Sequence, residues 1–108
     1  MFRLTRAFTT LLACGLIAAP ALAAPTEISI ASGRPGGIYY PVAGAICSLV
    51  NEHSSEHGIT CTVQLGVGSV KNIRSMLDGE ATLAMTQSDI QRDAVEGIGA
   101  FAEAGPAT

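Results

Sequence analysis

Apolar and polar positions between residues 27 and 96 follow two periods in turn, and this pattern predicts three strand-helix pairs. Alternating or continuous apolar residues predict strands. These are expected at 27–31, 59–65 and 81–85. Apolar residues at helical spacing predict helices. These are expected at 41–57, 69–78 and 88–96.

The first predicted helix is marked by its apolar stripe and by its ends. Pro41 suits the first helical position, where its missing N–H is not needed. Gly58 is expected to stop the helix after a frayed, solvated segment at 53–57. The expected buried face consists of Val42, Ile46, Leu49 and Val50.

The two later helices carry serines at their expected caps. Ser69 is predicted to cap the second helix. Ser88 and Gln91 have the spacing of a capping box for the third. The buried face of the second helix is expected to hold Val70, Ile73 and Leu77. From Gly97 onward, glycine and proline predict irregular chain.

The predicted order β-α-β-α-β-α belongs to the α/β class, with parallel strands and right-handed crossovers. Three short strands make a thin sheet with exposed edges. Residues 100–108 show no element that would close it. We therefore expect residues 24–108 to be part of a larger α/β protein.

The first 23 residues resemble a secretory signal peptide in layout. Two arginines and no acid precede the apolar run 7–19, Pro20 breaks that run, and Ala21-Leu22-Ala23 places small residues at a cleavage site. Cleavage after Ala23 is expected, with Ala24 as the competitor. A retained membrane anchor or a lipoprotein box ending at Cys14 are the alternatives. Export predicts a periplasmic location.

Composition and charge exclude several classes of protein. Hydrophobic residues make up 48% of the chain, which argues against wholesale disorder. The net charge is −3. Residues 24–108 retain four Lys or Arg residues against nine acidic ones, so their charge is −5. Such a surface repels nucleic acid, and no nucleic-acid partner is expected.

Two cysteines, Cys47 and Cys61, remain after the predicted cleavage. An oxidising compartment favours a disulfide between them, and two buried free thiols are the alternative. In the chain-entropy model a loop of this size stabilises the fold by about 3 kcal/mol. The nearby His53 and His57 lack a matching ligand cluster, so no metal site is predicted.

A candidate binding site lies in the loops that follow the predicted strands. Ligands of parallel α/β sheets gather beyond the carboxyl ends of the strands. Each loop leads into a helix N-terminus, which presents unpaired N–H groups and a partial positive charge. Together they favour a carboxylate or phosphate. Residues that permit close approach or offer side-chain contacts are Gly33, Gly36, Gly37, Gly66, Gly68, Tyr39, Tyr40, Ser69, Asn72 and Gln87.

Simpler roles for these residues stay open. The glycines serve equally well as turn formers, and the serines as caps. No catalytic set or nucleophile elbow is present in the sequence, and the first loop lacks the Gly-Lys-Ser/Thr ending of a P-loop. Neither an enzyme nor a cofactor is predicted.

Three sequence blocks together resemble the TAXI solute receptors, the extracytoplasmic binding proteins of a class of TRAP transporters. The blocks are Gly36 to Gly44, Gly68 to Ile73 and Gly79 to Asp89. Cys47 and Cys61 also look like a cysteine pair found in a branch of that family. Departures occur at 66–68, where Thr-Gly-Gly is more usual, and at 34–35.

The resemblance implies lobe 1 of a type II periplasmic-binding-protein fold, with the second lobe absent from this sequence. It implies a carboxylate-bearing solute such as glutamate, delivered to a membrane permease. Carried over by position, the ligand contacts would be Tyr39, Ser69, Val70, Asn72 and Gln87. Two alternatives are an enzyme on a related fold and a receptor-like sensor or surface protein with no transport partner.

Overall fold

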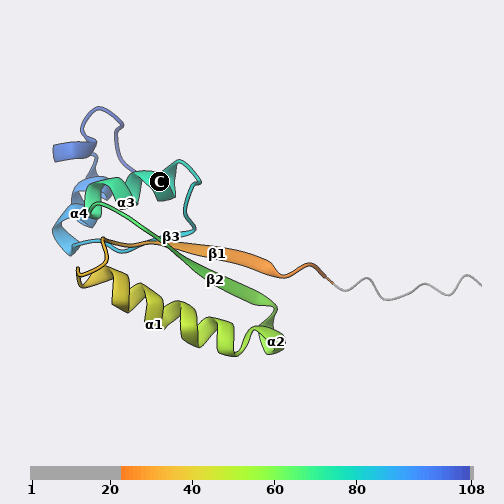
Figure 1. Cartoon of the computed structure of the whole chain (residues 1–108). Helices are drawn as coiled ribbons and strands as arrows, with labels where there is room; N and C mark the ends of the chain where they lie inside the picture. Colours follow the sequence, from red (N-terminus) through yellow and green to blue (C-terminus); the bar gives the residue numbers. More distant parts are fainter. Residues whose placement is uncertain (1–22, 108) are drawn as a thin grey trace, which may run out of the picture.

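The computed structural model describes residues 23–107 as a three-stranded parallel sheet with helices on both faces (Figure 1). The elements are β1 (Thr26–Ala31), α1 (Tyr39–Glu52), α2 (Ser54–His57), β2 (Ile59–Gln64), α3 (Ser69–Leu77), β3 (Leu83–Ala84), α4 (Ser88–Glu96) and the 3-10 helix η1 (Gly99–Phe101). Thus the α/β class and the predicted strand-helix order are confirmed. The expected signal peptide, except its last residue, lies outside the described residues. No helix within 23–107 has the length and apolar character to cross a membrane.

The sheet has the order β2-β1-β3, and both pairings are parallel as predicted. β1 lies in the centre and pairs with β2 from Thr26, opposite Ile59, to Ala31, opposite Gln64. β3 pairs with β1 only at Leu83 and Ala84, so this strand is shorter than the expected segment 81–85. In Figure 1, α1 lies on one side of the sheet, and α3 and α4 lie on the other.

The prediction for α1 was wrong at its start and for most of its buried face, since of the four expected residues only Val50 packs against the core. The helix begins at Tyr39, so Pro41 is its third residue, still within the first turn where no N–H is needed. Ala43 and Cys47 are buried, whereas Val42 and Ile46 are exposed and Leu49 is 63% exposed. The small side chains face the sheet because α1 lies close to β2, to which a disulfide joins it.

The predicted disulfide between Cys47 and Cys61 is confirmed, and it links α1 to β2. Both cysteines are buried and pack with Ile30 and Ala43 in one core cluster. The Asn51 amide adds two hydrogen bonds: its Nδ2 donates to the Cys61 carbonyl at 2.9 Å, and its Oδ1 accepts from the Cys61 N–H at 2.7 Å. The outer edge of β2 is therefore paired with a side chain, which protects an edge strand.

A second core cluster forms on the opposite face of the sheet from Ile73, Ala94 and Phe101. Residues 100–107 add no strand to the sheet, as the sequence predicted, but they contribute to this second cluster, which the sequence did not predict. Phe101 in η1 is 2% exposed, and the Ala107 N–H donates to the Ala94 carbonyl at 2.8 Å. This segment covers α3 and α4 because a single aromatic ring fills the space between them. Leu77 is exposed instead, although the helical spacing placed it on the buried face.

Candidate functional site at the carboxyl edge of the sheet

Three helices begin at the edge where the strands end. α1, α3 and α4 follow β1, β2 and β3, and their first turns lie on one side of the molecule, at the left in Figure 1. None of these three helices has a side-chain hydrogen bond at its N-cap. Apart from the Gln87 N–H, which donates to Ser69, the first N–H groups of these helices are therefore left for water or a ligand, and the helix dipoles favour a negative charge there.

The Ser69 hydroxyl joins the three helix starts. Its Oγ accepts a hydrogen bond from the Gln87 backbone N–H at 3.0 Å and lies 3.4 Å from the Tyr39 hydroxyl oxygen. Tyr39 is the first residue of α1, Ser69 is the first of α3, and Gln87 is the N-cap of α4. We call these three residues the junction. The structure thus brings together three residues that the sequence had placed in separate loops.

The junction has a hydrogen to offer beyond those it uses internally. Tyr39 and Ser69 together carry two hydroxyl hydrogens, and the contact between them uses one, whichever oxygen donates. At 3.4 Å this contact is long for a pair of hydroxyls, so neither group is tightly held by the other. The remaining hydrogen suits a ligand that only accepts, such as a carboxylate.

The predicted caps at Ser69 and Ser88 were wrong. Both serines are the first residues of their helices, and the N-cap positions are Gly68 and Gln87. Gly68 has a φ of 132°, a conformation that glycine adopts readily. Because Gly68 offers no side chain, the N–H groups of the first turn of α3 stay uncapped. The Ser69 hydroxyl bonds across to Gln87 instead.

Asn72 lies behind the junction, 1% exposed. Its Nδ2 donates to the Ser32 carbonyl at 2.5 Å and to the Met85 carbonyl at 2.8 Å. Ser32 is fully buried, and its Oγ donates to the Gln64 carbonyl at 2.7 Å. Sequence reasoning missed Ser32. A polar residue directly after an apolar strand and before a glycine was the available signal.

The other predicted contacts lie around the junction. Gly36 and Gly37 are exposed in a turn of the β1–α1 loop, closed by a bond from the Gly37 N–H to the Arg34 carbonyl at 3.0 Å. Val70 is half-buried, one residue beyond Ser69, and packs against the Phe101 cluster. Contact of these residues with a solute stays a prediction.

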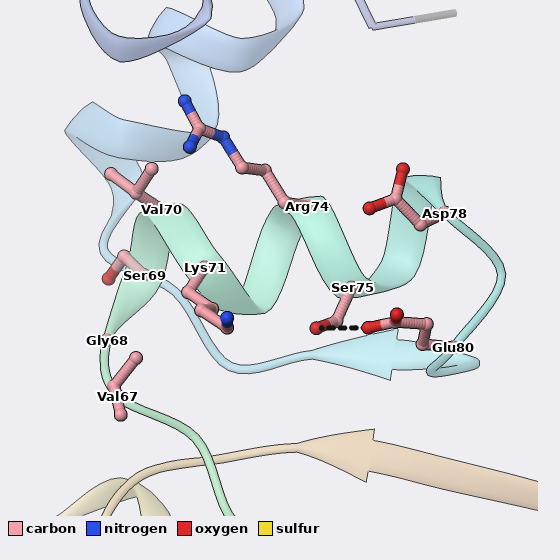
Figure 2. Close-up of a pocket in the computed structure, with 9 residues that line it drawn as sticks. All are labelled: Val67, Gly68, Ser69, Val70, Lys71, Arg74, Ser75, Asp78 and Glu80. Carbon is pink, nitrogen blue, oxygen red and sulfur yellow. Dashed lines mark hydrogen bonds between the residues drawn. The ribbon is translucent and has the colours of Figure 1, made fainter.

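A groove of about 450 Å³ runs along α3 from the junction (Figure 2). Its lining residues are Val67, Gly68, Ser69, Val70, Lys71, Arg74, Ser75, Asp78 and Glu80. Figure 2 shows Lys71 near the Ser69 end, and the Ser75 hydroxyl bonded to the Glu80 carboxylate at 3.2 Å. Arg74 donates to the Ala100 carbonyl at 2.8 Å, so its charge is engaged with the chain around η1. The cation closest to Ser69 along α3 is therefore Lys71.

Formal charges are sparse near the junction. Asp89 is the only acidic residue in the first turns of α1, α3 and α4, and it is exposed. Within residues 23–107, close contacts between basic and acidic side chains are His53–Glu56 and Arg92–Asp93, and neither involves a junction residue. No group of three metal-ligating side chains occurs in this described part of the chain. Backbone N–H groups and hydroxyls therefore dominate the polar character of the junction.

A sequence model of the NMT1-like family matches residues 30–108, more than half of the chain. The chain belongs to the NMT1-like family. This is a periplasmic binding-protein family related to solute receptors, and its members are typically extracytoplasmic. The match begins inside β1 and includes every residue of the junction. The disulfide between Cys47 and Cys61 is compatible with a location outside the cytoplasm.

Proposed function

We propose that this protein is the extracytoplasmic solute receptor of a TAXI-type TRAP transporter. In this proposal it binds a small carboxylate-bearing solute, such as glutamate, and delivers it unchanged to a membrane permease. Membership of the NMT1-like family supports a solute-binding role. The resemblance of residues 36–44, 68–73 and 79–89 to the TAXI receptors supports the finer assignment.

The convergence of three uncapped helix starts on the Ser69 hydroxyl carries the proposal. A carboxylate oxygen accepts hydrogen bonds and donates none at neutral pH, which matches the donors at the junction. Hydrogen bonds to a charged acceptor are about twice as strong as those between neutral groups. We therefore expect a carboxylate to bind better than the amide of the same shape, which brings N–H donors of its own.

The test is a thermal melting series on the disulfide-intact, full-length receptor, because the family resemblance places the solute between two lobes. Glutamate and dicarboxylates are compared with their amides and with sodium chloride at equal ionic strength. A ligand that binds only the folded state raises the melting temperature with its concentration. The proposal predicts a rise with at least one carboxylate and none with its amide. Equal effects of carboxylate, amide and salt would reject it.

A further inference from the structure

Asn72 holds the ends of two strands with a single side chain. Its amide nitrogen donates to the carbonyl of Ser32, directly after β1, and to that of Met85, directly after β3. A primary amide has two N–H groups at a fixed angle in one plane, so the two carbonyls are held in a fixed relation. These bonds span 40 and 13 positions of sequence.

The chain after β2 also packs closely against the side-chain amide of Asn72. A side-chain carbon added at Gly66 would overlap both the Asn72 Oδ1 and the Ser32 carbonyl oxygen. Gly66 therefore lies in contact with Asn72 because it has no Cβ. One buried amide thus contacts the chain just beyond each of the three strands.

Each of these contact points precedes a junction residue in the sequence. Ser69 comes three residues after Gly66, and Gln87 comes two residues after Met85. Tyr39 begins the helix that follows the Ser32 loop. A shift of either carbonyl away from Asn72 would move the Tyr39 loop or the Gln87 loop relative to Ser69.

We propose that Asn72 is the positioning residue of the solute site: it sets the separation of Tyr39, Ser69 and Gln87 and does not itself touch the solute. This inference rests on the proposed function, because the junction is taken as the solute site. It replaces the ligand contact that the family resemblance implied for Asn72 with an indirect role. Preorganised donors bind better because less ordering is needed at the moment of binding.

The test compares Asn72→Ala with Ile73→Val. Ile73 is the next residue of α3, is 4% exposed and makes no side-chain hydrogen bond, so Ile73→Val trims the core and leaves the amide in place. Two quantities are measured on the full-length protein: hydrogen exchange of the Gln87 backbone N–H without ligand, and NMR shifts of backbone amides during a glutamate titration. Exchange rates of the variants are compared at temperatures chosen so that each variant has the same free energy of unfolding.

Asn72→Ala is expected to speed hydrogen exchange of the Gln87 backbone N–H about tenfold, which is the increase expected when this N–H loses one hydrogen bond. It is expected to weaken the glutamate response at least about fivefold. Ile73→Val is expected to change both by less than about twofold. If Asn72→Ala does not fold, Gly66→Ala replaces it, since it crowds the same amide.

The inference is overturned if Asn72→Ala changes the Gln87 exchange rate and the glutamate response no more than Ile73→Val does. It is also overturned if the glutamate response falls while Gln87 exchange is unchanged, because Asn72 would then act as a direct contact. A full-length wild-type protein that responds to none of the carboxylates in the melting series rejects the proposed function instead. In that case Gln87 exchange alone still decides whether Asn72 positions the junction.

Discussion

At the scale of single residues, the junction depends on the Ser69 hydroxyl. This group is part of a residue only 8% exposed, and it bonds to chain segments that are 18 and 30 positions away. A serine at the start of a helix ordinarily suggests a cap, which is a local role. Here the side chain bonds across to other loops, and sequence spacing alone cannot distinguish these two roles.

Ser69→Ala is predicted to weaken carboxylate binding and to lower the free energy of unfolding by about 1 kcal/mol, the worth of a typical hydrogen bond. The matched control is Ser75→Ala on the same helix. The Ser75 hydroxyl bonds only to the carboxylate of exposed Glu80, so its loss is expected to change both quantities little. Chemical denaturation and a glutamate titration measure the two effects. Equal losses in both variants would contradict this account of Ser69.

Substitution by alanine is predicted to have opposite effects on stability at two glycines. Gly66→Ala is expected to destabilise the fold by about 1–3 kcal/mol, because the new methyl group overlaps Asn72 and Ser32. Gly44→Ala in α1 is expected to stabilise it by about 0.5–1 kcal/mol, because that position is helical with open space around it. Urea denaturation compares them. If Gly66→Ala stabilised the fold, the close packing of Gly66 against Asn72 and Ser32 would be contradicted.

At the scale of elements, α1 shows why periodicity misled the prediction. Its sequence carries apolar residues around most of its circumference, so the larger side chains seemed to mark the buried face. The structure buries Ala43 and Cys47 instead, because the disulfide holds the helix axis close to β2. The start of the helix was predicted to within two residues, whereas its rotation depended on a tertiary link.

The disulfide is predicted to supply a large part of the stability of this small fold. Reduction, or the double change Cys47→Ala with Cys61→Ala, should lower the free energy of unfolding by about 3 kcal/mol, as expected for the loop it closes. Denaturation with and without a thiol reductant measures this. An unchanged midpoint after verified reduction would show that α1 is held by packing alone.

The segment around η1 provides a second test of element packing. Phe101→Ala should cost about 3–5 kcal/mol, because the ring is 2% exposed between α3 and α4. Ile98→Ala, three residues earlier and 44% exposed, is the control and should cost less than about 1 kcal/mol. Similar small costs for both variants in urea denaturation would mean that this segment does not close the second core cluster.

For the whole molecule, the sequence predicted the class, the order of elements, the parallel sheet and the cysteine pair. Those features follow from the spacing of apolar residues and from turn residues, and both are local properties of the sequence. It did not predict that Phe101 would close the second cluster or that Ser32 would be fully buried. Both depend on which segments meet in space, and single-sequence patterns do not contain that information.

The family match covers the part of the chain that forms the junction. The NMT1-like match covers α1, α3 and α4, the three helices whose first turns make the junction. The first turns of these helices carry one cation, Lys71, and one exposed acid, Asp89, so backbone dipoles act on an anion together with Lys71. The account therefore predicts binding that responds to the charge and shape of a carboxylate more than to bulk ionic strength.

The central claim is tested most directly by a ¹⁵N-resolved NMR titration of the full-length protein with glutamate, against sodium chloride at equal ionic strength. The account predicts that glutamate shifts the amide signals of residues 39–40, 69–71 and 87–89 most, and that salt alone does not. Largest shifts elsewhere, such as at 53–57, or the same pattern with both solutes would contradict it.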